Sequence, residues 1–311
     1  MSTHDGEAAA PVIAVTGADG FVGRATVARL RAAGLKARPL HRAQLGDLAS
    51  DAPIPDDALR GCSAVIHLAA RAHVMADKGM DGAALYDAVN VGGSLKLLAA
   101  ARRAGVARFV FVSSIKVAAE ATAPGTAIGI DAPAAPVGAY AISKAQAERR
   151  LREESEGIEL VIVRPTLVYG PGVKANMRAL IGAVARGMPL PLGGIANARS
   201  LISVNNLADA LRVCAVHAAA PGHAWVVADG PAVSTPRLVR AIAAASGRRA
   251  RLLDVPLPLM RALGRLTGRA DAIDRVAGSL AVDDSGFRER LGWIPVQSFE
   301  AGVAAMVEAM R

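Results

Sequence analysis

The sequence has few cysteines and no cluster of metal-binding side chains. Its two cysteines, Cys62 and Cys214, are far apart, and neither lies in a C-x-x-C pair. This excludes a disulfide framework and a zinc-ribbon spacing. The six histidines show no metal-ligand spacing either. We therefore expect no metal site, and two isolated cysteines are typical of a reduced, cytoplasmic protein.

Long hydrophobic runs are also missing. No stretch of about 18 apolar residues is free of charge and no signal-peptide pattern is present, so we expect no membrane-inserted segment. The stretch from Pro256 to Arg275 allows two interpretations, because it is rich in arginine and carries apolar residues at helical spacing. Those apolar residues are Leu257, Met260, Leu263 and Leu266. Such a helix can lie on an anionic membrane, but we expect a helix of a globular lobe with its apolar side inward.

Aromatic residues make up only 3% of the 311 residues. The chain is basic, with a net charge of +9, and a basic chain invites a nucleic-acid interpretation. However, the arginines are spread along the whole chain and no aromatic stacking motif occurs, which argues against a platform for single-stranded nucleic acid. We expect no nucleic-acid partner, and we attribute part of the charge to binding of small molecules that carry phosphate.

Six short apolar segments with strand character alternate with helical patterns. They cover residues 12–16, 35–40, 64–68, 108–113, 160–164 and 224–228. This alternation predicts an α/β fold with a Rossmann-like, doubly wound and mainly parallel sheet. In such a sheet the ligand lies outside the carboxyl ends of the strands.

The first strand runs into a glycine-rich turn, Gly17-Ala18-Asp19-Gly20-Phe21-Val22-Gly23, which opens an amphipathic helix. In this context the glycines predict a dinucleotide-binding loop. Gly17 permits the tight turn, Gly20 lets the backbone approach a pyrophosphate, and Gly23 lets the helix pack closely on the strand. The pyrophosphate is expected on the free N–H groups at the positive end of the helix.

The residues after the second strand bear on which dinucleotide is bound. A cofactor without a 2′-phosphate usually meets an acidic residue about 20 residues beyond the glycines, whereas this region has His41-Arg42 and no carboxylate before Asp47. Arg42 is able to pair with a 2′-phosphate, with help from Arg24. The cofactor is therefore expected to be NAD or NADP, with a slight lean to NADP. Surface positions for both arginines are an equally weighted alternative.

Tyr140 and Lys144 lie four residues apart, which places a phenol and an ammonium on one face of a helix. A nearby ammonium favours the phenolate, so we expect the pKa of Tyr140 to fall below its usual value of about 10. A phenol tuned in this way acts as a general acid or base on an alcohol hydroxyl. The same spacing occurs by chance on many solvated helices, and the glycine loop upstream is what gives it weight.

Four further segments follow in an informative order. They are Asp47-Leu48, His67-Leu68-Ala69-Ala70, Val110-Phe111-Val112-Ser113-Ser114 and Arg164-Pro165-Thr166-Leu167-Val168-Tyr169-Gly170-Pro171. Together with the glycine loop and the tyrosine–lysine pair, they resemble the extended short-chain dehydrogenase/reductase superfamily and, within it, the NAD-dependent epimerase/dehydratase family. The resemblance runs from about Val12 to Trp293. It is greatest to bacterial UDP-sugar 4-epimerases and 4-keto-reductases that serve polysaccharide pathways.

The resemblance implies roles for individual residues. Tyr140 would be the acid/base, Lys144 would hold the nicotinamide ribose, and Ser114 would hydrogen-bond the reacting sugar oxygen. Ser113 is the neighbouring candidate, but side chains alternate along a strand, so only one of the two faces the cleft. The family pattern favours Ser114. The cofactor contacts implied are Gly17, Gly20, Phe21, Val22, Gly23, His41, Arg42, Asp47, Leu48, Leu68, Ala69, Ala70, Tyr140, Lys144 and Pro165.

The resemblance also bears on the substrate and the reaction. Asn176 would donate to a nucleotide-sugar diphosphate, and Arg199 would pair with its oxygens, for which a planar guanidinium is well suited. The implied partner is a UDP-sugar such as a UDP-(N-acetyl)hexose, and relatives are often homodimers. Dehydratases of the family carry an Asp-Glu pair just after the serine. This chain has Ile115 and Lys116 there, which argues against dehydration.

These motifs also suggest how the chain is divided. We expect residues 1–10 to be disordered and residues 11–168 to form the NAD(P)-binding domain, with later strands around 200–230 returning to it. Residues 169–311 would form mainly a smaller substrate-binding lobe. Residues 119–137, rich in Ala, Pro and Gly, would form a loop or mobile flap over the substrate.

Three functions stay open at this point. The first is an NAD(P)-dependent nucleotide-sugar epimerase or 4-keto-reductase that acts at sugar C4 by hydride transfer. The second is a non-catalytic dinucleotide-binding sensor or scaffold, which the fold alone does not exclude. The third is an NADPH-dependent reductase of a small non-nucleotide carbonyl, which would leave Asn176 and Arg199 without a diphosphate to bind.

Overall fold

The computed structural model describes residues 10–72, 80–268 and 270–311. The expected disorder of residues 1–10 therefore concerns residues outside the described part of the chain, apart from Ala10. The helices are α1 (Phe21–Ala32), α2 (Arg42–Leu45), α3 (Met80–Tyr86), α4 (Gly93–Arg103), α5 (Ala139–Glu154), α6 (Ala175–Ala185), α7 (Val204–Val216), α8 (Thr235–Ala245), α9 (Leu257–Leu266), α10 (Ala270–Ala277), α11 (Ser285–Leu291) and α12 (Phe299–Glu308). A π-helix, η1 (Asp87–Gly92), precedes α4, and a 3₁₀ turn, η2 (Ile115–Val117), follows the fourth strand.

Six parallel strands form the main sheet in the order β2-β1-β3-β4-β5-β8. They are β1 (Val12–Thr16), β2 (Lys36–Leu40), β3 (Ala64–His67), β4 (Arg108–Val112), β5 (Glu159–Pro165) and β8 (Ala224–Val227). The prediction of a doubly wound, mainly parallel sheet is confirmed. Strand order reverses between β1 and β3, and at that point the carboxyl edge of such a sheet leaves a crevice for a ligand.

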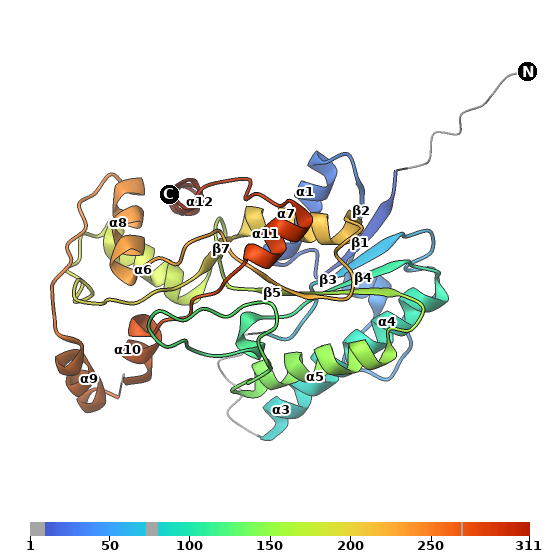
Figure 1. The fold of residues 1–311 in the computed structure, drawn as a ribbon, viewed down its shortest axis with the longest axis horizontal. Helices are drawn as coiled ribbons and strands as arrows, with labels where there is room; N and C mark the ends of the chain where they lie inside the picture. The colour runs from blue at the N-terminus through green and yellow to red at the C-terminus, as the bar shows by residue number, and fades with distance from the viewer. Residues whose placement is uncertain (1–9, 73–79, 269) are drawn as a thin grey trace, which may run out of the picture.

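Helices cover both faces of this sheet. Figure 1 shows α1, α7 and α11 on one side and α3, α4 and α5 on the other. The strands serve both layers because alternate side chains point to opposite faces. Val110 and Val112 pack in one hydrophobic cluster with α1 and α7, whereas Phe109 and Phe111 pack in the other with α4 and α5. Apolar runs without alternation, as in β4, follow from burial on both faces.

The remaining elements form a second group at the other end of the molecule (Figure 1). Two short parallel strands, β6 (Leu167–Tyr169) and β7 (Leu201–Ser203), pair with each other. Side chains of α6, α8 and α12 pack in a hydrophobic cluster of their own that includes Tyr169. This small sheet was not predicted, because three-residue strands are too short to show a period.

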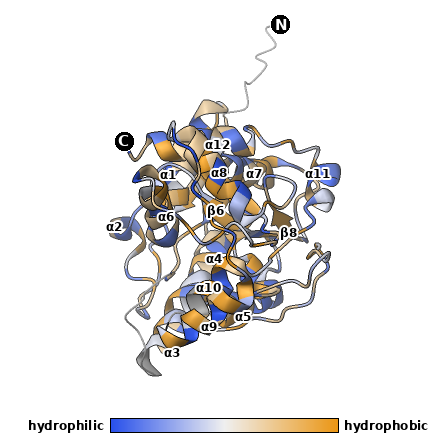
Figure 2. Cartoon of the chain, turned by 90° about the vertical axis from the view of Figure 1, so that its left-hand side faces the viewer, coloured by the Kyte–Doolittle hydropathy of each residue, from blue (hydrophilic) through white to orange (hydrophobic). Residues whose placement is uncertain are grey.

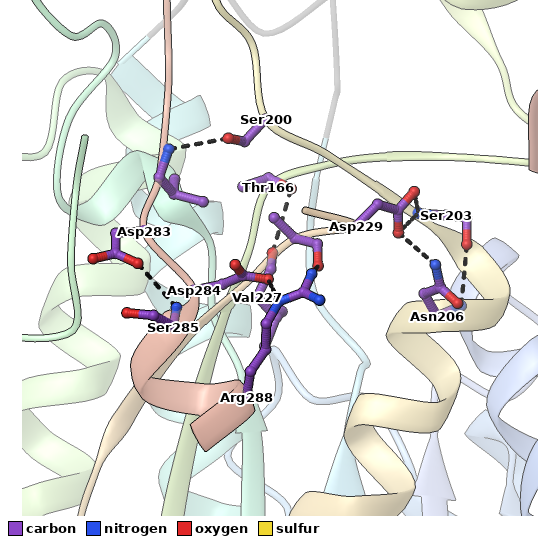
Figure 3. Close-up of polar contacts among 12 residues, drawn as sticks. Thr166, Ser200, Ser203, Asn206, Val227, Asp229, Asp283, Asp284, Ser285 and Arg288 are labelled. Atoms are coloured by element: carbon purple, nitrogen blue, oxygen red, sulfur yellow. Dashed lines mark hydrogen bonds and ion pairs between the residues drawn. The ribbon is translucent and has the colours of Figure 1, made fainter. Parts of the chain in front are cut away.

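A half-buried carboxylate ties this group to the main sheet just after β8. Asp229 accepts hydrogen bonds from the Tyr169 hydroxyl (2.6 Å), the Asn206 side chain (2.7 Å) and the Ser203 backbone N–H (2.9 Å). Figure 3 shows Asp229 facing Ser203 and Asn206, with Thr166 donating to the Val227 carbonyl nearby. Burial raises the pKa of Asp229 in spite of these partners. The polar contacts therefore hold the chain where it leaves the main sheet.

The helix predicted between Pro256 and Arg275 is present as α9 and α10, but its apolar side is not wholly inward. Met260 is buried and Leu257 is half-buried, whereas Leu263 and Leu266 are exposed. The prediction fails because α10 packs on one side of α9, and Leu263 and Leu266 on the other side stay open to solvent. No helix in the described ranges has the length and apolarity to cross a bilayer.

The segment 119–137 is hydrogen-bonded along its length rather than free. The Thr122 N–H donates to Ser279, and the Ile128 N–H donates to Ala281. The Ala135 N–H donates to Val117. The expected loop is thus present, and these contacts join it to residues 279–281. That it moves as a flap stays a prediction.

Candidate active site

The glycine loop is packed so tightly that side chains cannot enter it. Gly17 has φ +64°, and a Cβ placed on it would lie 2.9 Å from the Ala69 nitrogen. A Cβ on Gly23 would lie 2.1 Å from the Gly17 carbonyl oxygen. Gly20 is the N-cap of α1, no side chain caps this helix, and its first turn holds no acidic residue. The half-buried Phe21 and Val22 follow. A helix start left open in this way suits an anion, so the loop fits the pyrophosphate of a dinucleotide.

A buried chain of hydrogen bonds fixes the next segment beside the loop. The Thr16 hydroxyl lies 2.7 Å from His67 Nδ1 and accepts from the N–H groups of Leu68 and Ala69. His67 Nε2 lies 3.0 Å from the Ser94 hydroxyl, which donates to Asn90 at 2.6 Å.

The donors in this series of hydrogen bonds determine which ring nitrogen of His67 carries the proton. Because the single proton of Ser94 goes to Asn90, His67 Nε2 must be the donor toward Ser94, and Nδ1 must accept from Thr16. Burial and the neighbouring Lys144 lower the pKa of His67 to about 3, so the ring is neutral. His67 is thus a structural residue: it fixes Thr16, whose hydroxyl holds the N–H groups of Leu68 and Ala69 next to Gly17.

At the predicted adenosine end, the charged side chains pair with each other. Arg42 forms an ion pair with Asp47, and His41 Nδ1 lies 2.7 Å from Asp19. The hydrogen bond from the Ala49 N–H has the largest effect on Asp47 and lowers its pKa, and the positive charge of Arg42 lowers it further. Leu48 packs against Gly93, where a Cβ would approach to 2.9 Å. Since Arg42 has an acidic partner, the observation that favoured a 2′-phosphate is weakened.

Tyr140, Ser114 and Lys144 come together where β4 ends. Ser114 follows β4 as the N-cap of η2, and its side chain hydrogen-bonds Tyr140 near the start of α5. Lys144, one turn further along α5, is buried, donates to the Val112 carbonyl at 2.8 Å and lies 4.4 Å from the centre of the Phe111 ring. β1, β3, β4 and β5 are parallel, so Gly17, Ala69 and Ser114, which follow strand ends, lie at the same edge of the sheet as Pro165, the last residue of β5.

The prediction that Lys144 lowers the pKa of Tyr140 is wrong for the protein without ligand. Burial raises the pKa of Tyr140 to about 12, although the hydrogen bond with Ser114 opposes this rise. Burial also lowers the pKa of Lys144 to about 7, against the raising effect of Glu148. Desolvation dominates both groups, because each is taken out of water before any cofactor charge is present.

A buried carboxylate behind Lys144 was missed. Glu148 accepts from Ser113 Oγ at 2.6 Å and forms a bidentate ion pair with Arg164, with distances of 3.0 and 2.7 Å. Glu148 and Arg164 are 2% and 5% exposed. Ser113 thus points to Glu148, while Ser114 points to Tyr140. The i, i+4 spacing from Lys144 to Glu148 was a signal, but the partners at 113 and 164 appear only in the fold.

The two residues expected to bind a diphosphate are placed differently. Asn176 is exposed near the start of α6 and follows Ala175, the one non-glycine residue of the described chain with a positive φ, 52°. Arg199 is half-buried, and its Nη1 donates to the carbonyls of Arg275 (2.7 Å) and Gly278 (3.0 Å). In the ranges the structure describes, no carboxylate pairs with Arg199, so its charge is available to an anion.

Arg199 is also connected to the segment that carries Ser114. Its neighbour Ser200 donates its N–H to Leu280 at 2.9 Å. Leu280 packs with Ile115 and Ala118, just beyond Ser114. Arg199 is therefore linked to the segment after Ser114 through its neighbour Ser200 and through Leu280. Of the side chains described, no group of three or more His, Cys, Asp or Glu is arranged to hold a metal ion.

Comparison with known proteins supports this assignment. Residues 13–228 match the model of the NAD dependent epimerase/dehydratase family. The chain is 39% identical to a UDP-glucose 4-epimerase of Vibrio cholerae, covering 96% of this chain and 94% of that protein. It is 27% identical to an N-acetyl-alpha-D-glucosaminyl-diphospho-ditrans,octacis-undecaprenol 4-epimerase of Escherichia coli O157:H7, over 85% and 83% of the two chains.

Solved structures agree on the fold. The UDP-glucose 4-epimerase of Thermus thermophilus in complex with NAD superposes with a TM-score of 0.72 at 23% identity, covering 96% of this chain and 99% of that one. The sheet order, the glycine loop and the match over most of the chain lead to one conclusion. This protein belongs to the NAD-dependent epimerase/dehydratase family.

Proposed function

We propose that this protein is an NAD(P)-dependent 4-epimerase of a UDP-sugar. The observation that carries the proposal is the contact of Tyr140 with Ser114, with Lys144 one turn behind, at the sheet edge that also holds the glycine loop. The 39% identity to a UDP-glucose 4-epimerase over nearly the whole chain supports the epimerase over the 4-keto-reductase. Reductases of other carbonyl compounds among the relatives are less similar, at 28% and 27% identity, and the presence of Tyr140, Ser114 and Lys144 together argues against a sensor.

The residues divide the chemistry among them. The bound nicotinamide supplies the acceptor and donor of hydride. Tyr140 takes the proton from the sugar 4-hydroxyl as hydride leaves C4, and it returns a proton to the 4-keto oxygen when hydride comes back to the opposite face. Ser114 donates to the same oxygen, where negative charge develops. Lys144, one turn further along α5 and held by the Val112 carbonyl, would hold the ribose of the cofactor.

The raised pKa of Tyr140 determines when this proton transfer can begin. At neutral pH the phenol is protonated in the protein without ligand, because burial raises its pKa to about 12. A positive charge placed beside the ring would favour the phenolate. We therefore expect the pKa of Tyr140 to be lower with an oxidised cofactor bound than without it.

The substrate is held by its diphosphate in this proposal. Arg199 is half-buried and has no acidic partner in the described ranges, and Asn176 lies near the start of α6. Residues 169–311, apart from α7, β8 and α11, which join the main sheet and its helical layer, would form this substrate lobe. The relative from Escherichia coli acts on a sugar diphosphate of undecaprenol, so the group beyond the diphosphate differs within the family. The higher identity of the relative from Vibrio cholerae favours UDP.

The direct test is a panel of UDP-hexoses and UDP-N-acetylhexosamines incubated with the protein, with and without added NAD+ or NADPH, and followed by NMR. An epimerase yields the C4 epimer without net consumption of cofactor. Consumption of one NADPH per 4-keto sugar would identify a reductase instead. If cofactor binds but no UDP-sugar is altered in either condition, the proposal is wrong.

A further inference from the structure

Helix α9 presents a row of leucines to the solvent. Leu259, Leu263 and Leu266 are 52%, 53% and 84% exposed, and their spacing of four and three residues puts them on one face of the helix. Leu253, just before the helix, is 51% exposed as well. We call the three side chains on α9, Leu259, Leu263 and Leu266, the leucine row. Single exposed leucines are ordinary, but a contiguous row is typical of an interaction surface.

The leucine row is held outward by the packing of the opposite side of α9. Gly264 packs against α10 so closely that a Cβ there would lie 2.4 Å from Ile273 Cδ1. Arg261 forms an ion pair with Asp274 at 2.8 Å. α10 in turn is held by Asn197 and Arg199, which donate to carbonyls at its end. The row therefore keeps its outward direction through fixed contacts.

The segment that carries the row is rich in arginine. Residues 248–277 contain seven arginines and three aspartates, a net charge of +4. Arg265, on α9 itself, is exposed, and no carboxylate in the described ranges pairs with it. Figure 1 places α9 at the end of the molecule away from the main sheet, and Figure 2, viewed toward that end, shows α9 beside α10 with both hydrophobic and hydrophilic residues on it.

We infer that α9 docks on the surface of a membrane containing anionic phospholipid. The leucine row would enter the interface, and the arginines would meet lipid phosphates, the pattern of an interfacial amphipathic helix. A second copy of this chain fits less well, because two copies of the same arginine-rich segment would face each other. The contact is peripheral and spans nothing. It goes beyond the sugar chemistry and does not depend on it.

Docking would also orient the candidate site. Arg199, whose Nη1 holds the end of α10, is the residue we assign to the substrate diphosphate. A membrane bound by α9 would therefore lie on the side of the molecule where α10 contacts Arg199. This connection is a consequence of the docking and not an argument for it.

The test is sedimentation of the full chain with vesicles of phosphatidylglycerol and phosphatidylcholine in equal parts, compared with pure phosphatidylcholine. We expect binding to the anionic vesicles only, weakened at high salt because screening reduces the attraction of arginine to phosphate. The double variant Leu263→Ser, Leu266→Ser should bind at least about tenfold more weakly, since two apolar side chains are lost from the interface. Arg265→Glu should bind more weakly too.

Ile294→Ser is the matched control, because Ile294 is 79% exposed but lies outside α9. It should bind like the wild type. All variants change exposed residues, so thermal unfolding should be unaltered and loss of fold can be separated from loss of docking. Equal binding of wild type and the leucine double variant, or no binding of the wild type, would overturn the inference. Self-association that the leucine variants abolish, without vesicle binding, would show a dimer surface instead.

Discussion

At the scale of single residues, Ser113 and Ser114 offer a matched comparison. They are adjacent, but Ser114 contacts Tyr140 whereas Ser113 donates to Glu148. Ser114→Ala should lower kcat by a factor of about 10² with little change in stability, because it removes a donor to the reacting oxygen. Ser113→Ala should instead cost about 1 kcal/mol of folding free energy and leave kcat within a few-fold. Steady-state kinetics with urea unfolding separates the two, and the reverse pattern would refute the assignment.

His67 should make the protein sensitive to acid. Its pKa falls from 6.5 to about 3 on folding, so between these values the unfolded chain binds a proton that the folded protein does not. Stability is therefore full above about pH 6.5 and decreases as the pH falls toward 3. Between about pH 6.5 and pH 5 the loss is about 2 kcal/mol. The check is a comparison of the urea midpoints of wild type and His67→Gln at pH 7 and pH 5.

In that comparison, the midpoint of the wild type should fall more between the two pH values than that of His67→Gln. Parallel shifts of the two proteins would show that other groups cause the acid sensitivity. The four described carboxyls whose pKa is lowered, Asp47, Asp209, Asp283 and Glu300, titrate below this range. They therefore contribute little to the slope between pH 7 and pH 5.

At the scale of elements, α5 carries two glutamates in contrasting settings. Glu148 is buried with Arg164, whereas Glu153 is half exposed in ion pairs with Arg149 and Arg150. Glu148→Ala leaves a buried guanidinium without its partner, and we expect a loss of about 3–5 kcal/mol. Glu153→Ala should cost about 0.5 kcal/mol or less. Chemical denaturation measures both, and equal effects would show that Glu148 does not join β4, β5 and α5.

The junction of β1 and α1 depends on the missing side chain of Gly23. In Gly23→Ala the new Cβ would lie 2.1 Å from the Gly17 carbonyl oxygen, so backbone must move and the loop must lose its shape. We expect affinity for NAD+ or NADP+ to fall by at least about tenfold because the helix start no longer meets the pyrophosphate. Gly92→Ala is the control, since its Cβ would meet nothing within 4 Å. Titration calorimetry that finds equal affinities for both would contradict this reading of the loop.

At the scale of the whole molecule, most of the main sheet was predictable from the sequence. The buried strands read as apolar runs of the right length, and each lies within about two residues of its expected position. The strands β6 and β7 are too short to show a periodic pattern. The exposure of the leucines on α9 depends on which side of that helix α10 covers. Periodicity identifies an apolar face but does not specify what covers it.

Only part of the candidate site was predictable from the sequence. The spacing of Tyr140 and Lys144 and the glycine loop are local patterns, so the sequence displays them. The pKa of Tyr140 was expected in the wrong direction, because spacing reports a nearby charge but not desolvation, which is the larger effect here. The network of Glu148 and the proton arrangement around His67 join residues distant in sequence, and only the folded chain brings them together.

The most direct test of the account follows deuterium placed at C4 of a UDP-sugar that the protein turns over. NMR of the product reports whether the label stays with the sugar while C4 is inverted. The account predicts an inverted product that keeps its deuterium, and a rate about a thousandfold lower in Tyr140→Phe with cofactor binding intact. Loss of the deuterium to water, or a Tyr140→Phe variant that turns over at the wild-type rate, would contradict it.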